Sequence, residues 1–158
     1  MLTLIATVDP GNNINVPWLS PTNLSFFLSE TIGGTLIMSA SQYGEYEKRI
    51  DLSGWNVLII DHGMKRSPGG EPVFQHVTEA LKHCWKMQYS RIYVLGDHNL
   101  YHAAIKKADR IIMGTSKESA KTDNGHFPNL NSQDWNRSQL WLPDCEVVPI
   151  VKEYTRIH

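Results

Sequence analysis

Two Asp-His pairs, Asp61-His62 and Asp97-His98, each follow directly after an apolar run of the sequence. His98 and His102 are four residues apart, a spacing that places two imidazoles on one face of a helix, where they can chelate a metal ion. No HExxH-type motif supplies a catalytic base beside them. We therefore favour the simpler interpretation, in which Asp97 caps a helix, the histidines are solvated and there is no metal site.

Both pairs lie where a predicted strand ends. Short apolar runs rich in β-branched residues predict strands at residues 2–8, 34–39, 56–61, 91–96, 110–116 and 146–157. Helical patterns lie between them, at residues 21–31, 40–49, 71–87 and 97–108, and a polar, loop-rich segment covers residues 115–139. This alternation predicts one α/β domain over residues 1–158, with a mixed, mostly parallel sheet, helices on both faces and an antiparallel C-terminal edge.

In such a sheet, ligands bind in a crevice beyond the carboxyl ends of the strands. Polar residues follow several of the predicted strands at this edge, namely Asp9, Ser39, Ser41, Asp61, His62, Asp97 and His98. We expect the two strands that end in the Asp-His pairs to be neighbours, so that their polar side chains meet.

The composition is that of an ordinary globular chain. Of its 158 residues, 41% are hydrophobic and 20% charged, and the net charge of −1 gives no reason to expect nucleic acid or an anionic membrane as partner. The sequence has no signal-peptide pattern and no apolar run of the ~18 residues that cross a bilayer. We expect a cytoplasmic monomer or homodimer in which Cys84 and Cys145 are buried free thiols.

The segment 21–31 predicts an amphipathic helix with a polar group on its apolar face. Ser20 is a suitable cap, and Pro21 suits the first helical position. Leu24, Phe27 and Leu28 form one apolar stripe. Asn23 lies one turn before Phe27, and its amide is the unexpected group on that stripe.

Four segments, in this order and spacing, resemble the dihydrofolate reductase family. They are LIATVD…NNINVPWLSPTNLSFF, with the pair Pro17-Trp18, then TLIMSAS, then RIYVLGDHNLYHAAIKKADRIIMGTS, and finally NGHFPNLNSQDW, with His126-Phe127-Pro128 and Trp135. A related reductase domain from riboflavin synthesis shares that family's fold, but the Pro-Trp and His-Phe-Pro pieces favour the folate branch.

The resemblance implies a flat slot for a pterin, lined by Ile5, Ala6, Leu24, Phe27, Leu95 and Gly114. Asn23 takes the place of the family's catalytic acid, which holds the pterin's amino-pyrimidine edge and promotes its protonation. A neutral amide cannot stabilise a protonated ring as a carboxylate does. Gly114 takes the place of the threonine that supports the acid, so this chain lacks both members of that hydrogen-bonded pair.

The resemblance also implies an NADPH or NADH site, formed by Thr7, Ser39, Ser41, Gln42, Asp61, His62, Gly96, Asp97, His98, Asn99 and Tyr101. Here too the chain departs from the family. Ala40 stands where an arginine binds phosphate, and Asp61 would repel a 2′-phosphate but accept a hydrogen bond from a free ribose hydroxyl. Asp97 replaces the second glycine of a Gly-Gly turn, where its carboxylate caps the helix and opposes a pyrophosphate.

Two hypotheses follow from the sequence. In the first, the chain transfers hydride from NAD(P)H to dihydrofolate or a related pterin, with weak or altered activity. In the second, it is an inactive pseudoenzyme that keeps the fold as a ligand-binding or structural, interacting protein. The sequence leaves both open.

Overall fold

The protein is built around one mixed β-sheet, which includes both the first and the last strand of the chain. The structure is a computed structural model that describes residues 1–15, 21–63, 67, 69–116, 119, 124–141 and 150–158. Over these residues the sheet has nine strands, in the order β5-β4-β3-β6-β1-β7-β9-β8, with β2 paired to β1 beside this path. The strands are β1 (Leu2–Val8), β2 (Ile14–Asn15), β3 (Thr35–Ser39), β4 (Asn56–Ile60), β5 (Val73–Phe74), β6 (Ile92–Leu95), β7 (Arg110–Thr115), β8 (Trp135–Trp141) and β9 (Ile150–Arg156).

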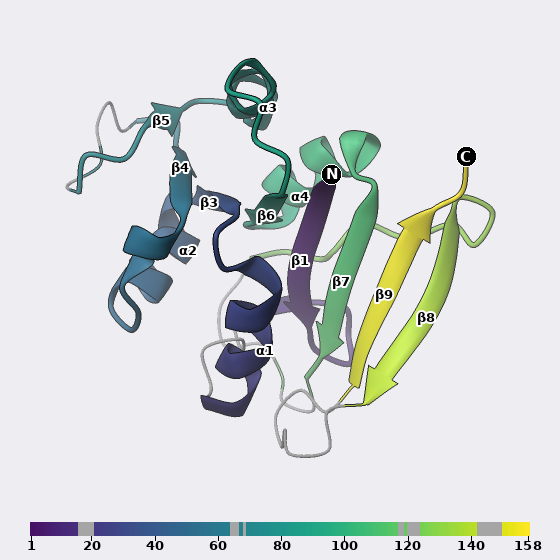
Figure 1. The fold of residues 1–158 in the computed structure, drawn as a ribbon. Coiled ribbons are helices and arrows are strands. Elements are labelled where there is room, and N and C mark those ends of the chain that lie inside the picture. The colour runs from purple at the N-terminus through teal and green to yellow at the C-terminus, as the bar shows by residue number, and fades with distance from the viewer. Residues whose placement is uncertain (16–20, 64–66, 68, 117–118, 120–123, 142–149) are drawn as a thin grey trace.

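The central strands are parallel and the C-terminal pair is antiparallel. β1 runs parallel to β6 and β7, and β3 runs parallel to β4 and β6. β9 pairs antiparallel with both β7 and β8, and Figure 1 shows this pair at one end of the sheet. The predicted fold class, a mostly parallel sheet with an antiparallel C-terminal edge, is confirmed.

Helices cover both faces of the sheet. They are α1 (Pro21–Thr31), α2 (Ala40–Glu47), α3 (Val77–Lys86) and α4 (His98–Ala104), with short 3-10 turns η2 (Leu52–Gly54) and η3 (Ile105–Lys107). Because side chains alternate along a strand, β1 contributes to two core layers. Leu4 packs in the layer that includes Val77 of α3 and Leu100 of α4, whereas Ile5 packs in the layer of α1 and α2.

The helix predicted at residues 71–87 is wrong in its first part. Residues Val73 and Phe74 instead form β5, which pairs with the end of β4, and α3 begins only at Val77. Val73 pairs with Ile59 and Phe74 with Ile60, and β-branched and aromatic residues such as these favour a strand. The helical pattern is therefore correct only for its second half.

Two further differences concern the strands. Residues 135–139, expected in a loop, belong to β8, which pairs with β9 along its whole length. The strands that precede the two Asp-His pairs are β4 and β6, and β3 lies between them, so the expectation that they are neighbours is wrong. Ser20, Cys145 and the first part of the predicted strand 146–157 lie outside the described residues.

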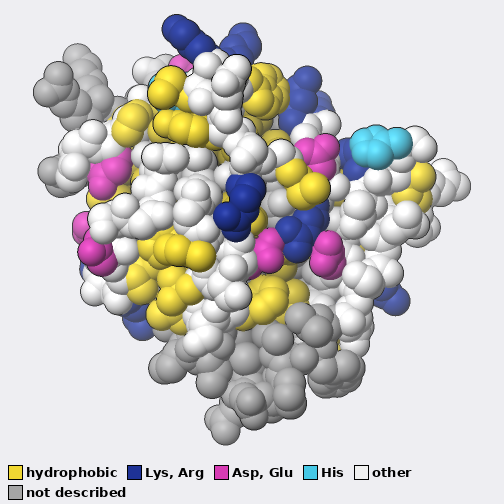
Figure 2. Space-filling view, viewed as in Figure 1, with side chains coloured by type: hydrophobic (Ala, Val, Ile, Leu, Met, Phe, Trp, Pro, Cys, Tyr) yellow, Lys and Arg dark blue, Asp and Glu magenta, His cyan; other side chains and the backbone are white. Residues whose placement is uncertain are grey.

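Charged side chains of both signs share the surface. On the face seen in Figure 2, basic and acidic side chains are interspersed, and among the described residues Arg110 forms ion pairs with Glu30 and Glu153. Hydrogen bonds to these two carboxylates outweigh burial and raise the pKa of the Arg110 guanidinium.

Within the described part of the chain, none of the helices has the length and hydropathy that crossing a membrane requires.

Candidate functional site

The sheet opens between its two central strands, β1 and β6. The β1–β6 pairing runs from Leu2 with Ile92 only as far as Leu4 with Val94. Beyond that point β1 continues beside β7, and β6 continues beside β3. The hydroxyl of Tyr101 donates to the Ile5 carbonyl oxygen at 2.8 Å, directly after the last β1–β6 pair. The opening therefore lies at the carboxyl ends of the strands, where α/β proteins bind ligands.

Most of the side chains predicted for a substrate slot lie together on the α1 face of this opening. Ile5, Phe27 and Leu95 belong to one buried cluster, and the half-buried Leu24 packs against it. Ala6 does not join them, because alternation along β1 places its side chain in the opposite core layer. Asn23 lies in the first turn of α1, and its side chain is outside the described part of the structure.

Gly114 and Thr7 face each other across the β1–β7 ladder. They are paired in the parallel register, so their Cα atoms lie side by side at the same level of the sheet. Thr7 is fully buried, and its hydroxyl has no hydrogen-bond partner in the described structure. Sequence reasoning placed both residues at the site, but the orphaned hydroxyl is visible only once the strands are in register.

The turn between β6 and α4 is shaped by glycine and capped by aspartate. A Cβ built on Gly96 would lie 2.3 Å from the Leu100 side chain, so the strand can enter the helix this closely only without a side chain. Asp97 Oδ1 accepts a hydrogen bond from the Leu100 amide at 3.0 Å, which is the predicted helix cap. This cap places a carboxylate directly after Gly96, at the start of α4.

A cavity of about 400 Å³ lies against this turn. It is lined by Asp97, His98, Asn99, Asn124, Gly125 and His126. His98 Nδ1 lies 2.7 Å from the His126 carbonyl oxygen, so Nδ1 is the protonated nitrogen and donates to it. A Cβ on Gly125, whose φ is +79°, would lie 2.6 Å from the His98 Cβ. The two segments thus approach closely through a glycine and form one wall of the cavity.

A second cavity of about 250 Å³ follows the end of β4, and Asn99 lines both cavities. It is lined by Ile60, His62, Gln75, His76, Val77, Thr78, Asn99, Leu100 and Ala103. The imidazoles of His62 and His76 are in edge contact, with ring centroids 5.2 Å apart. Although β4 and β6 are not neighbours, the structure still brings the ends of both strands to this shared region. Sequence reasoning missed Gln75 and His76, because they lie in the segment predicted as helix.

The start of α2 is tied to the same edge. The Ser39 hydroxyl accepts a hydrogen bond from the Gln42 amide at 3.3 Å and lies 3.2 Å from the Ser41 hydroxyl. The Gln42 side-chain amide donates to the Gly96 carbonyl oxygen at 3.4 Å, which links α2 to the β6–α4 turn. The predicted cofactor residues after β3 and β6 are therefore in direct contact, whereas His62 is connected to them through the second cavity, which Asp61 does not line.

The histidines of α4 form a stacked surface pair. His98 and His102 are exposed, with ring centroids 5.3 Å apart and nearly parallel planes. In the part of the chain that the structure describes, no group of three or more His, Cys, Asp or Glu side chains is placed to hold a metal ion.

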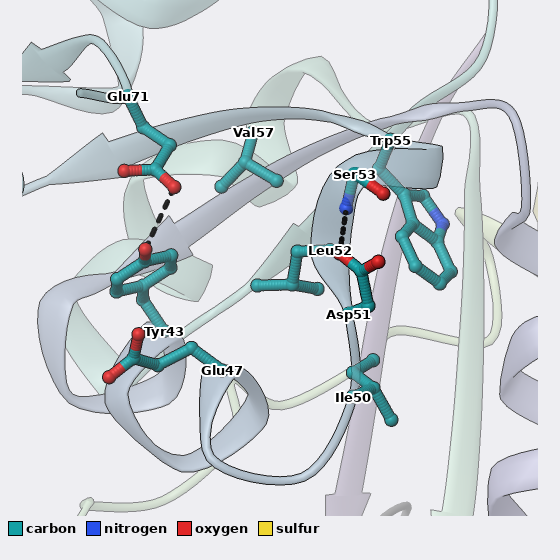
Figure 3. A pocket seen from close by; sticks show the side chains of 9 residues that line it. All are labelled: Tyr43, Glu47, Ile50, Asp51, Leu52, Ser53, Trp55, Val57 and Glu71. Carbon is teal, nitrogen blue, oxygen red and sulfur yellow. Dashed lines mark hydrogen bonds between the residues drawn. The ribbon is translucent and has the colours of Figure 1, made fainter. Parts of the chain in front are cut away.

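A third cavity, of about 430 Å³, lies on the outer side of α2 and was not predicted from the sequence (Figure 3). It is lined by Tyr43, Glu47, Ile50, Asp51, Leu52, Ser53, Trp55, Val57 and Glu71. The Tyr43 hydroxyl donates to Glu71 Oε1 at 2.8 Å, and Ser67 donates to the other carboxylate oxygen. Burial alone would raise the pKa of Glu71, but these two hydrogen bonds outweigh it and lower the pKa.

The fold is that of an α/β protein with cavities at the carboxyl edge of a mostly parallel sheet, the edge at which such proteins bind ligands. The family model for dihydrofolate reductase matches residues 1–141, so the chain belongs to the dihydrofolate reductase family.

A solved structure agrees with this assignment. The dihydrofolate reductase from Enterococcus faecalis, complexed with NADP(H) and RAB-propyl, superimposes with a TM-score of 0.81 at 22% sequence identity, covering 100% of this chain and 97% of that chain. At this identity the likeness shows the fold. A sequence comparison with curated proteins gives no match.

Proposed function

We propose that the chain is a reductase that transfers hydride from NADPH or NADH to dihydrofolate or a related pterin, with weak or altered activity. The observation that carries the proposal is the pair of cavities that share Asn99 along the carboxyl edge of the sheet, beside the opening between β1 and β6. A dinucleotide is an extended ligand, and two cavities that share a lining residue at this edge suit it. The Enterococcus faecalis relative in complex with NADP(H) supports the same cofactor class.

The residues around the β6–α4 turn suit such a cofactor. Gly96 and Gly125 let the β6–α4 turn and residues 124–126 pack closely against α4, and the Gln42 side chain ties α2 to the same turn. Asp97, His98, Asn99 and Tyr101 are the remaining residues that we assign to the cofactor at this end, and Thr7, Ser39, Ser41, Asp61 and His62 complete the set. The nicotinamide, when bound, supplies the hydride. An aspartate at the turn weakens the binding of a pyrophosphate, since like charges repel.

Asn23 is the reason to expect slow chemistry. Reduction of a pterin needs a proton as well as a hydride, and a carboxylate favours the protonated ring electrostatically. The amide of Asn23 can orient the ring through hydrogen bonds, but it carries no charge to stabilise the proton. Ile5, Leu24, Phe27 and Leu95 supply the apolar surface on which a flat ring packs.

The proposal is tested by mixing the purified protein with dihydrofolate and either NADPH or NADH, and by following the absorbance of the reduced cofactor. We expect a slow decrease that needs both the protein and dihydrofolate. No turnover above the buffer rate with either cofactor would refute the proposal.

A pseudoenzyme is the second candidate, and one observation favours it. The Asp97 carboxylate accepts the hydrogen bond of the Leu100 amide at the start of α4 and places a negative charge there. This charge opposes the binding of an anionic cofactor. On this view NADPH gives no thermal shift, whereas a bound ligand at a hundredfold excess over its Kd stabilises a protein by about 2.7 kcal/mol. A clear shift in Tm with NADPH, and another with a folate analogue, would exclude the pseudoenzyme that has lost both ligands.

A further inference from the structure

The third cavity, of about 430 Å³ beside α2, is separate from the region that we assign to the substrate and the cofactor. Among the described residues it shares no lining residue with either cavity at the carboxyl edge of the sheet. Its walls come from α2, from residues 50–55, from Val57 of β4 and from Glu71 before β5. Small-molecule sites usually have volumes of about 300–1,000 Å³, so this cavity can hold a ligand of its own.

Apolar and aromatic side chains form the base of this cavity. Val57 is buried, and Ile50, Leu52 and Trp55 are half-buried and pack against the same core cluster. Figure 3 shows Leu52 and Val57 in the middle of the cavity. The Trp55 indole Nε1 donates to Thr31 Oγ1 at 3.2 Å, which fixes the ring in place. The base is therefore a hydrophobic surface on which the alkyl part of a ligand can pack.

Three carboxylates surround this base, at two ends. Glu71 and Glu47 lie at one end, above and below Tyr43, and Asp51 lies at the other end (Figure 3). Burial raises the pKa of Tyr43, and the negative charges of Glu71 and Glu47 raise it further, so both charges are close to the phenol. Hydrogen bonds from Ser53 lower the pKa of Asp51, so this carboxylate, like that of Glu71, is ionised at neutral pH.

The charges that line the cavity all have the same sign. None of the described residues around it is Lys, Arg or His, and within the described structure Glu47, Asp51 and Glu71 form no ion pair. Such a cavity repels the anions dihydrofolate and NADPH and attracts a cation. In the described part of the chain no three such groups are placed to hold a metal ion, because the carboxylates are spread apart. The cation that suits them is an extended organic one.

We propose that the third cavity binds a linear aliphatic diamine. One ammonium group lies between Glu47 and Glu71, and the other lies at Asp51. The alkyl chain that joins them lies over Leu52 and Val57. An ammonium group donates three hydrogen bonds, which carboxylate oxygens accept, and it is attracted to a neighbouring aromatic ring. This inference is independent of the proposed function, because the two sites are lined by different residues and take ligands of opposite charge.

Titration of the isotope-labelled protein with putrescine, followed by NMR, tests the proposal. We expect the amide signals of Glu47 and Ser53 and the indole signal of Trp55 to shift in a saturable way. The Leu100 amide signal, at the β6–α4 turn, stays in place. High ionic strength weakens the binding, because salt screens exposed charges. Butylamine has a single ammonium group on the same alkyl chain, so its Kd is about fivefold higher than that of putrescine.

Glu47→Gln and Glu45→Gln form a matched pair of variants. Both residues are exposed on α2, two positions apart, but only Glu47 lines the cavity. Each substitution removes one negative charge with little change of size. We expect the Kd for putrescine to rise about fivefold in Glu47→Gln and to stay unchanged in Glu45→Gln. The Tm of both ligand-free variants stays that of the wild type, because these side chains are exposed.

Asp51→Asn tests the second end of the site. Asn retains the cap at the start of η2 and removes the charge. In this variant putrescine loses its advantage over butylamine, because the second ammonium group has no carboxylate to bind.

The inference is overturned if putrescine gives no saturable shift at Glu47, Ser53 and Trp55. Equal weakening in Glu47→Gln and Glu45→Gln would show that only net charge matters, and would overturn it as well. So would butylamine that binds as tightly as putrescine, or Mg²⁺ that shifts the same signals to the same extent. Turnover of dihydrofolate, measured on the same preparation, tests the proposed function separately, so either can fail without the other.

Discussion

Replacing Asp97 by Asn separates the two roles that the structure gives this residue. Its Oδ1 accepts the Leu100 amide and caps α4, and its charge faces the cavity that we assign to an anionic cofactor. Asn caps a helix about as well as Asp does, so Asp97→Asn removes the charge and retains the cap. We expect this variant to bind NADPH more tightly than the wild type, with an unchanged Tm in the absence of ligand.

The size of the gain follows from Coulomb's law. Two unit charges 4 Å apart interact by about 1 kcal/mol in water and by about 4 kcal/mol at an effective dielectric constant of 20. Asp97 is half-buried beside an open cavity, so the lower figure applies. A gain of about 1 kcal/mol corresponds to a Kd for NADPH that falls about fivefold. Salt screens the repulsion, so the difference between variant and wild type shrinks at high ionic strength.

Asp97→Ala and Asp51→Asn complete the experiment. The alanine variant loses the cap as well as the charge, which costs about 1 kcal/mol of folding free energy and lowers the Tm by about 2–4 °C. Asp51 is a second capping aspartate, which lies after α2 at the start of η2. Its carboxylate accepts a hydrogen bond from the Ser53 amide at 3.0 Å. Asp51→Asn changes the net charge by the same amount without touching the β6–α4 turn.

Isothermal titration with NADPH at low and high salt measures these differences. Equal tightening in Asp97→Asn and Asp51→Asn would mean that net charge alone matters, and the local argument would be wrong. An unchanged Kd in Asp97→Asn would refute the assignment of the turn to the cofactor's phosphates.

Three further outcomes are expected. The double variant Asn23→Asp with Gly114→Thr raises the rate of dihydrofolate reduction by about 10²-fold, as a positioned general acid does, and failure to restore either binding or turnover would place the loss elsewhere. Phe27→Ala, which deletes a fully buried ring, lowers the free energy of unfolding in urea by about 3–5 kcal/mol, and a loss under 1 kcal/mol would contradict the packing. Burial raises the pKa of the Cys84 thiol from 9.0 to about 11, so in a Cys145→Ser background this thiol resists alkylation until the protein unfolds. The same shift stabilises the folded protein fully below pH 9, and the free energy of unfolding falls as the pH rises through 11.

The central parallel strands were predictable because their burial leaves a clear pattern in the sequence. The buried residues of β4 and β6 are apolar on both faces, as is expected of strands covered by helices on both sides, and β1 is buried along its whole length. The helical pattern at 71–87 misled because periodicity is a local signal, whereas β5 exists only through its pairing with a distant strand. The strand order was not predictable for the same reason, since nothing local places β3 between β4 and β6.

Within the candidate site, too, local features were predictable from the sequence and tertiary contacts were not. The cap by Asp97 follows from one residue type at one helix start, and the structure confirms it. The orphaned hydroxyl of Thr7 depends on the register of β1 with β7, and the contact between the Phe27 and Tyr46 rings depends on how α2 packs against α1. The link from Gln42 to the Gly96 carbonyl joins residues 54 positions apart. Such contacts are set by tertiary structure, which the sequence does not display.

The buried hydroxyls of Thr7 and Tyr46 give a last prediction, on stability. Both residues are 0% exposed, and in the described structure neither hydroxyl has a hydrogen-bond partner. Each unpaired buried hydroxyl costs about 1–3 kcal/mol, and the whole fold of such a protein is stable by only about 5–15 kcal/mol. Thr7→Val and Tyr46→Phe remove the hydroxyls with little change of shape, so we expect each variant to unfold at the same Tm as the wild type or at a higher one. A lower Tm in either variant would mean that its hydroxyl stabilises the fold, and the argument from the missing partner would be wrong.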